Sequence, residues 1–410
     1  MRILLAATSM LVIFCSVLPT GVSALKPPDI TAESAILVDS ETNQVLYEKK
    51  ADVRRAPAST TKLMTAILLI ENCRLDAMVM AGKHVEEIPS SSLHLRPGEK
   101  IAVHELLHAM LLRSANDAAV AAAQHVAGSV SAFVKMMNKR AAEMGATSTH
   151  FANPNGLNSV GHYSTARDLA LIGKRAIHIP IINRIVAKRK TTISRSMNRE
   201  DVVLFNRSHF LRWYPGADGI KTGYTREAGQ CLVASATRDG WRLIAVVLKS
   251  NNNAADAGAL MDYGFSSFER KLLARRGCVV AQAGIRGGKQ KTVGAAPATD
   301  VYAVVPKTWQ GETKTETEIE KVSAPMASGR RVGEMSAILD GQVVQRTPLV
   351  ATEYVGKSLI AAVWPWVRNC ALILAVGMVI GRKYGAATAK SSRRRGRRFQ
   401  TSVRRINRIW

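Results

Sequence analysis

The chain has 410 residues, a formal net charge of +26 at pH 7 and five cysteines, and this length leaves room for two domains with further segments at either end. The cysteines are widely spaced, which argues against a disulfide framework and a cysteine-based metal site. Positive charge is densest from Arg382 onward, where the sequence has no Asp or Glu, so residue for residue it describes the C-terminal tail more than the body of the protein.

The first 24 residues have the layout of a secretory signal peptide. A single arginine, Arg2, precedes an apolar stretch over residues 3–18, and small residues lead up to Ala24. A buried N-terminal helix is the alternative, but the polar residues from Lys26 onward offer it no apolar surface to pack against. We therefore expect the protein to be exported and cut after Ala24.

The elements between Lys26 and Arg276 predict one α/β domain. Apolar and polar residues alternate on both sides of residues 40–43, which predicts a β-hairpin. Apolar residues at helical spacing over 102–146 predict a helical region. Strand-like sequence returns over 217–250 and turns at Asp239 and Gly240, which predicts a second group of strands.

The sequence pattern changes at Gly277, which predicts a second, smaller domain from there onward. Short β-like runs are separated by glycine, proline and charged turns as far as residue 353. This spacing is typical of a small all-β domain.

An apolar run near the C-terminus, Leu359–Gly381, is long enough to span a bilayer. Trp364 and Trp366 suit the membrane–water interface, but Arg368 near the middle of the run costs about 2.5 to 3.5 kcal/mol in a spanning helix. An interfacial helix and a buried core helix therefore stay open beside a spanning one. The basic residues from Arg382 onward follow this run directly and fit a topology anchor or a patch for lipid headgroups.

The stretch ASTTKLMTA (58–66) places Ser59 and Lys62 three residues apart. In a helix that begins near Ser59, as Pro57 upstream suggests, both side chains lie on one face. A lysine in the first turn faces the positive end of the helix dipole and loses solvation if it is buried, and both effects favour the neutral amine, a base that can activate the serine. A capping serine beside a surface lysine is the commoner origin of an isolated Ser-x-x-Lys.

Two further short motifs follow in the sequence. RSANDAA supplies Ser114 and Asn116 inside a helical stretch, and GIKTGYT supplies Lys221, Thr222 and Gly223 on a predicted strand. Each motif alone is weak, because the first is also typical of a helix interruption and the second is common on edge strands. Together with Ser-x-x-Lys, in this order, they form the set found in class A β-lactamases and penicillin-binding proteins.

The chain resembles the low-molecular-mass penicillin-binding proteins of the D-alanyl-D-alanine carboxypeptidase type. The segments SSSLHLRPGEKIAVHELLHAMLLRSANDAA, FANPNGL, GHYSTARDLA and ADGIKTGYTREAGQCLVASATRDGWRLIAVVL carry the resemblance in the first domain. GGKQKTVGAAPATDVYAVVPK and LDGQVVQRTPLVA resemble the family's C-terminal β-rich domain, which serine β-lactamases lack.

The resemblance implies an α/β, β-lactamase/transpeptidase-like catalytic domain, in which helices and an all-helical region flank a central antiparallel sheet. A small all-β domain and a C-terminal membrane helix follow. The expected division of the chain is a signal peptide (1–24), a penicillin-binding D,D-peptidase domain (25–276), a β-rich domain (277–353), a membrane-anchoring helix (354–381) and a basic, disordered tail (382–410).

The resemblance to this family implies catalytic roles for residues of the first two motifs. Ser59 is expected to be the acylated nucleophile, Lys62 the base that takes its proton, and Ser114 a relay that passes a proton toward the leaving D-alanine. Asn116 is expected to hydrogen-bond the peptide backbone of the substrate. Ala115 stands where the family more often has glycine, and little consequence is expected because that side chain has no role.

The substrate site is expected on the strand of the third motif. Lys221 and Thr222 are expected to bind the terminal carboxylate, and Gly223 lets the strand approach the substrate closely. The backbone N–H groups of Ser59 and Tyr224 are expected to form the oxyanion hole, where they face the charge of the tetrahedral intermediate.

The deacylating glutamate of class A β-lactamases has no counterpart here. That glutamate lies on a loop between the second and third motifs, and residues 149–168 contain none. His162 and Asp168 could replace it, although both are more typical of structural positions. An acyl-enzyme with penicillin is therefore expected to persist.

The leading hypothesis is a periplasmic serine carboxypeptidase, anchored to the inner membrane, that removes the terminal D-alanine of peptidoglycan pentapeptides. A D,D-endopeptidase acting on cross-links, a β-lactamase and a binder of anionic lipid or nucleic acid through the basic tail are the alternatives. Sparse tail aromatics argue against nucleic acid. Expected partners are stem peptides, β-lactam antibiotics and membrane lipids, with no cofactor and no metal.

Overall fold

The computed structural model describes residues 26–89, 91–198, 200–360 and 362–382. The predicted signal peptide and all but the first residue of the predicted basic tail lie outside this range. The described residues divide into two compact units, one of residues up to 271 together with 302–312 and one of residues 272–301 together with those from 313 onward.

The first unit is built on a five-stranded antiparallel sheet with the order β2-β1-β9-β8-β7. Both predicted hairpins are present, and Asp239 and Gly240 turn between the longest strands with positive φ. The bounds are β1 Ser34–Asp39, β2 Val45–Lys49, β7 Ala217–Thr225, β8 Gly229–Arg238 and β9 Trp241–Ser250.

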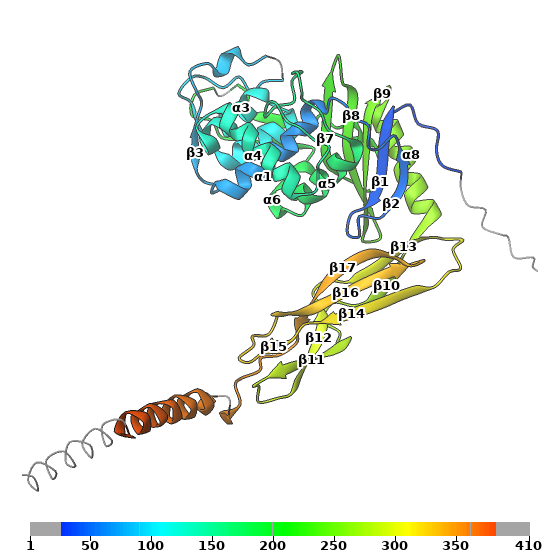
Figure 1. The fold of residues 1–410 in the computed structure, drawn as a ribbon. Coiled ribbons are helices and arrows are strands. Elements are labelled where there is room, and N and C mark those ends of the chain that lie inside the picture. Colours follow the sequence, from blue (N-terminus) through cyan, green and yellow to red (C-terminus); the bar gives the residue numbers. More distant parts are fainter. Residues whose placement is uncertain (1–25, 90, 199, 361, 383–410) are drawn as a thin grey trace, which may run out of the picture. The chain divides into compact units, whose positions relative to one another are not determined.

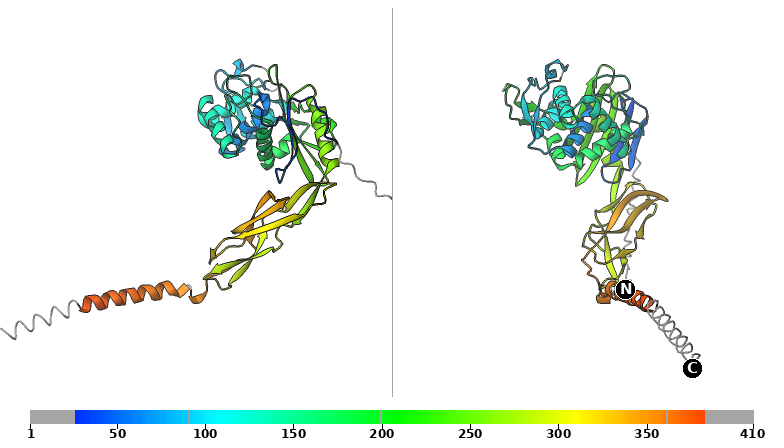
Figure 2. Two further views of the ribbon diagram at one scale, coloured as in Figure 1. Left: turned by 45° about the vertical axis from the view of Figure 1, so that its right-hand side comes forward. Right: turned by 60° about the vertical axis from the view of Figure 1, so that its left-hand side comes forward.

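The two faces of the sheet are covered by different helices (Figure 1, Figure 2). On β8, Cys231 and Val233 belong to the core shared with the helical region, whereas Leu232 and Ala234 belong to the core under α8 (Asn253–Ser267). This alternation is the period-2 pattern of a strand buried on both faces. The short helix α7 (His209–Trp213) packs beside α8.

The helical region lies between β2 and β7 in the sequence. Its helices are α1 Lys62–Asn72, α2 Val103–His108, α3 Asn116–Ala127, α4 Val130–Glu143, α5 Ala166–Ile177 and α6 Pro180–Val186. Two short antiparallel strand pairs belong to the same part of the chain. They are β3 Met78–Met80 with β4 Lys100–Ala102, and β5 Lys190–Thr192 with β6 Val203–Phe205.

The sequence leaves the second motif open between a helical stretch and a helix interruption, and the structure has the interruption. A π-helical turn at Ala109–Arg113 ends at Ser114, which is left-handed with φ 66° and ψ 31°. The chain then re-enters a helix at Asn116. A left-handed residue cannot continue a right-handed helix, so Ser114 lies at a helix break and Asn116 begins the next helix.

The second unit is β-rich. Its six-stranded sheet has the order β14-β16-β17-β12-β11-β15, and one face buries a small core that includes Val293, Met335 and Leu349. The bounds are β11 Ala281–Arg286, β12 Thr292–Pro297, β14 Thr313–Ile319, β15 Val322–Ser323, β16 Arg331–Leu339 and β17 Gln342–Ala351. The chain passes between the units within β10 (Phe268–Ala274), at the start of β13 (Val301–Pro306) and again just before β14.

A helix over Ala362–Arg382 is long and apolar enough to cross a membrane, with a mean hydropathy of 1.6. It begins later than residue 354. Val355 instead belongs to the β-rich unit, where it is 2% exposed and pairs with Met326.

Candidate active site

Ser59 lies on a 3-10 turn, Ala58–Thr61, and Lys62 is the first residue of α1. The turn takes the place of the helix start that the sequence predicts near Ser59, yet it preserves the expected contact. Lys62 Nζ lies 2.9 Å from Ser59 Oγ. The Lys62 side chain is completely buried, so the pair meets at the edge of the core rather than on the surface.

Two carbonyl oxygens complete the surroundings of the Lys62 amine. Nζ donates to Asn116 Oδ1 at 2.7 Å and to the backbone oxygen of Asn155 at 2.6 Å. A neutral amine has two N–H groups and one lone pair. Because the two carbonyl groups take the N–H groups, the lone pair is left to accept the Ser59 hydroxyl proton.

Burial lowers the pKa of Lys62 well below its usual range, and the charges of Lys221 and Arg207 lower it further, while Asp117 opposes them. Removing an ammonium group from water disfavours its charged form. The neutral base inferred from the first motif therefore has a physical cause, and burial is the largest contribution.

A second lysine–serine pair lies beside the first. Lys221 Nζ donates to Ser114 Oγ at 3.0 Å and to the backbone oxygen of Thr222 at 2.9 Å. Burial, followed by the charge of Arg207, lowers the pKa of Lys221 to about 7. The helix break at Ser114 thus brings the second motif against the third.

Strand β7 holds the third motif at the free edge of the sheet. Gly223 approaches Ser59 so closely that a Cβ there would lie 3.0 Å from Ser59 N and 3.0 Å from Ala58 Cβ. Strand alternation turns the side chains of Thr222 and Tyr224 to the opposite face of β7, and Tyr224 is 69% exposed.

The motif residues open onto a cleft of about 600 Å³. The residues that line it are Ser59, Ser91, Ser114, Arg207, His209, Thr222, Gly223, Tyr224, Gln230 and Asn253. Within the described part of the chain, no carboxylate side chain belongs to this lining.

Arg207 and Asn155 are absent from the sequence-based site. Arg207 donates from Nη1 to Ser91 Oγ at 2.6 Å on the cleft wall. A single arginine among 57 basic residues carries no signal in the sequence. Asn155 contributes its backbone oxygen to Lys62. Every residue type has such an oxygen, so the sequence gives no signal for this contact.

His162 and Asp168 are held in structural hydrogen bonds. His162 Nδ1 accepts from the backbone N–H of Ala152, so its other nitrogen donates to Thr61 Oγ1 at 2.9 Å. Burial lowers the pKa of His162 to about 4, which keeps it neutral. Asp168 accepts from Ser148 N and Thr149 Oγ1. Neither residue lines the cleft.

A serine paired with a buried lysine of lowered pKa, beside a sheet flanked by helices, defines a serine hydrolase of the penicillin-binding protein fold, which confirms the predicted fold class. The chain belongs to the D-alanyl-D-alanine carboxypeptidase family of peptidases (S11), whose sequence profile matches residues 21–252. Residues 268–357 match the C-terminal domain of penicillin-binding protein 5. The predicted resemblance is thereby confirmed.

Individual relatives agree with this assignment. The chain is 34% identical over 338 residues to the D-alanyl-D-alanine carboxypeptidase DacF of Bacillus subtilis, covering 80% of this chain and 86% of the relative. It is 33% identical to DacA of Escherichia coli over 80% of this chain and 84% of the relative. The crystal structure of penicillin binding protein 5 from Haemophilus influenzae aligns with a TM-score of 0.66 at 30% identity, covering 81% of this chain and 100% of that chain.

Proposed function

We propose that this D-alanyl-D-alanine carboxypeptidase removes the terminal D-alanine of peptidoglycan pentapeptides through an acyl ester on Ser59. The observation that carries the proposal is the contact of 2.9 Å between Ser59 Oγ and the buried Lys62 amine. Lys62 takes the hydroxyl proton as Ser59 attacks the peptide carbonyl, and Ser114 passes a proton to the leaving amine.

The cleft supplies partners for the ends of the scissile peptide. The terminal carboxylate binds Thr222 and Lys221, with the Arg207 guanidinium as a further cation on the same wall. Asn116 hydrogen-bonds the substrate backbone. The N–H groups of Ser59 and Tyr224 stabilise the oxyanion, and the close approach of β7 at Gly223 supports this arrangement.

The proposed location is the periplasmic face of the inner membrane. An exported chain loses its signal peptide after Ala24, and the helix Ala362–Arg382 anchors it in the lipid. The basic tail then contacts anionic headgroups. In this location the site meets stem peptides and β-lactam antibiotics.

Penicillin tests the proposal. Its ring carbonyl takes the place of the scissile amide, so Ser59 is acylated, but a cleft lining without a carboxylate offers no general base for rapid hydrolysis. Mass spectrometry after mixing with excess penicillin should find one adduct, on the peptide that carries Ser59, which persists for minutes. Each tenfold slowing corresponds to about 1.4 kcal/mol of barrier.

A parallel assay with a peptide ending in D-alanyl-D-alanine should release D-alanine. Rapid penicillin turnover without a detectable adduct would instead identify a β-lactamase and overturn the proposal.

A further inference from the structure

One end of the six-stranded sheet in the β-rich unit is strongly basic. Three chain segments meet there, namely residues 286–291 between β11 and β12, residues 320–331 between β14 and the start of β16, and residues 352–358 after β17 (Figure 1). We call these segments the basic end. They hold seven basic residues and two acidic ones. All seven basic residues are exposed: Arg286, Lys289, Lys291, Lys321, Arg330, Arg331 and Lys357.

Hydrogen bonds join the three segments into one surface. Lys289 N donates to Gly356 O, and Ser358 N donates to Gly287 O, both at 2.9 Å. The parallel pairing of β15 with β11 brings the middle segment against the first. The basic side chains therefore project from a hydrogen-bonded scaffold.

Few of these charges are compensated within the unit. Among the described residues, Arg331 is the only one of the seven in an ion pair, with Glu320 at 3.0 Å and Glu334 at 3.5 Å. The other acid of the basic end is Glu353. Like charges that lie close together repel one another, and an anionic surface relieves this repulsion. The basic end therefore has the charge of a binding surface for anions.

The helix Ala362–Arg382 begins directly at the basic end. Ala362 N donates to Ser358 O at 2.9 Å, so the helical turn that leads into it starts one residue after Lys357. Trp364, which suits the membrane interface, follows Lys357 by seven residues. At 1.5 Å per helical residue this is about 10 Å, which is about one Debye length at 0.1 M salt. A helix in the lipid, whether it spans or lies on the surface, therefore keeps Lys357 within reach of the headgroups.

An exposed tyrosine adds a side chain that suits the interface. Tyr354 is 65% exposed and lies in the segment that runs into the helix. Tyrosine is enriched at membrane surfaces because its ring is apolar and its hydroxyl group is wet. Anionic lipid fits this surface better than a soluble polyanion does, because the helix already holds the basic end at the bilayer.

We propose that the basic end of the β-rich unit binds anionic phospholipid headgroups. This inference rests on the proposed location at the membrane, and it concerns a surface separate from the basic tail, which follows the helix at its other end. Attraction of this kind falls off with distance and salt, so the helix remains the anchor. The basic end then determines which side of the β-rich unit faces the lipid.

Lysine reactivity tests the inference with the full-length protein. It is reconstituted into vesicles of phosphatidylcholine alone or of an equal mixture with phosphatidylglycerol, and flotation checks the insertion. A neutral, membrane-permeable acetylating reagent is added, and mass spectrometry measures the rate at each lysine. Lys289, Lys291 and Lys357 should react about fivefold more slowly in the anionic vesicles, and high salt should remove the difference. The exposed Lys135 and Lys139 of α4 should react equally in both.

Charge reversal tests the surface itself. Arg286→Glu combined with Lys289→Glu should remove most of the protection of Lys357. The matched control reverses Arg275 and Arg276, two exposed arginines that precede β11 at the opposite end of the sheet, and it should keep that protection. Penicillin acylation, measured on the same samples, should match the wild type in both variants.

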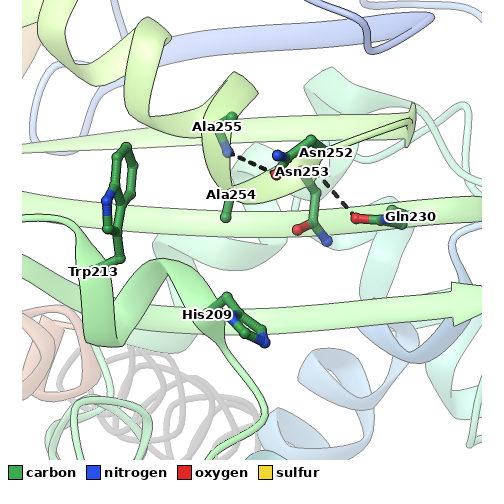
Figure 3. A pocket seen from close by; sticks show the side chains of 7 residues that line it. All are labelled: His209, Trp213, Gln230, Asn252, Asn253, Ala254 and Ala255. Carbon is green, nitrogen blue, oxygen red and sulfur yellow. Dashed lines mark hydrogen bonds between the residues drawn. The ribbon is translucent and has the colours of Figure 1, made fainter.

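An aromatic pair provides a second comparison. Tyr354→Ala should reduce the protection of Lys357 about twofold. Trp213 is similarly exposed (64%) and borders a hollow between α7 and α8 (Figure 3). Trp213→Ala should leave the protection unchanged.

Three results would overturn the inference. Equal reactivity of Lys357 in neutral and anionic vesicles would remove it and leave the membrane anchor standing, whereas a protein that does not float with vesicles would remove both. Protection that survives the Arg286 and Lys289 reversal but is lost in the Arg275 and Arg276 control would place the lipid contact elsewhere. Protection by isolated peptidoglycan in detergent, without protection by anionic vesicles, would assign the basic end to carboxylates of the cell wall. Loss of penicillin acylation in the wild type would instead count against the proposed enzyme function alone.

Discussion

At the residue scale, the proposed chemistry depends on the hydrogen-bond partners of the Lys62 amine. Its Nζ has three neighbours, Ser59 Oγ, Asn116 Oδ1 and the Asn155 backbone oxygen, all within 2.9 Å. Two of them can only accept hydrogen bonds from the amine. The remaining neighbour, the serine hydroxyl, can accept from an ammonium group or donate to a neutral amine, and burial of Lys62, which lowers its pKa, favours the neutral amine.

Removing either member of this pair should abolish acylation. Ser59→Ala deletes the proposed nucleophile, and Lys62→Ala deletes the proposed base, so labelling by fluorescent penicillin should fall at least a thousandfold in each variant. Circular dichroism should show a retained fold. The exposed lysine Lys83 provides the control, and Lys83→Ala should label like the wild type. Substantial labelling of Ser59→Ala would exclude Ser59 as the nucleophile.

The pKa of Lys221 predicts a pH dependence of substrate binding. Its pKa of about 7 means that the ammonium form prevails below that pH and the neutral form above it. A hydrogen bond to a charged group contributes about 1.5 to 3 kcal/mol. The kcat/KM of the peptide should therefore fall by about 10- to 100-fold between pH 6 and pH 9 as the carboxylate loses its cation.

The same peptide with its terminal carboxylate esterified separates binding from chemistry. It has no carboxylate for Lys221 to attract, so its kcat/KM should lack the alkaline fall. On the acid side both substrates should lose activity together, because protonation of Lys62 removes the base that they share. An alkaline fall of equal size for the ester would contradict the assigned role of Lys221.

At the element scale, the site depends on the contact between β7 and the 3-10 turn at Ala58–Thr61. Gly223→Ala tests this contact, because the new Cβ would lie 3.0 Å from Ser59 N and must displace the turn. Penicillin acylation should slow at least tenfold while the protein remains folded. The control is Gly284→Ala in β11, where a Cβ meets nothing within 4 Å. Equal acylation rates in the two variants would show that the contact is dispensable.

The elements also explain which parts of the site the sequence could reveal. Strand alternation and turn residues predicted the two hairpins and the position of Lys221, because these features depend on local pattern. Helical periodicity continues through Ser114, so the sequence left a helical stretch and a helix interruption open there, and the structure has the interruption at a single left-handed residue. Arg207 was missed because only the tertiary fold brings it to Ser91.

At the scale of the whole molecule, membrane attachment should be separable from catalysis. Val355 is buried in the β-rich unit, so a cut before it would expose that core. Ending the chain after Ser358 removes the helix Ala362–Arg382 and keeps this unit whole. The shortened enzyme should be soluble and should acylate Ser59 at the wild-type rate.

Fractionation of cells and penicillin labelling of the soluble fraction measure this outcome. A shortened protein that still sediments with membranes would place the anchor elsewhere. In the full chain, protease added to the cytoplasmic face of inverted vesicles should remove the arginine-rich tail if the helix spans the membrane. An intact tail would indicate a helix that lies on the outer surface.

The Asn155 contact has a consequence for the evolution of drug resistance. The atom that accepts from Lys62 is a main-chain oxygen, and every amino acid that a mutated codon could place there carries the same oxygen. Point mutation therefore cannot simply delete this partner of the base. The two other hydrogen-bond partners of the Lys62 amine, Ser59 Oγ and Asn116 Oδ1, are side-chain atoms, so a point mutation can remove them.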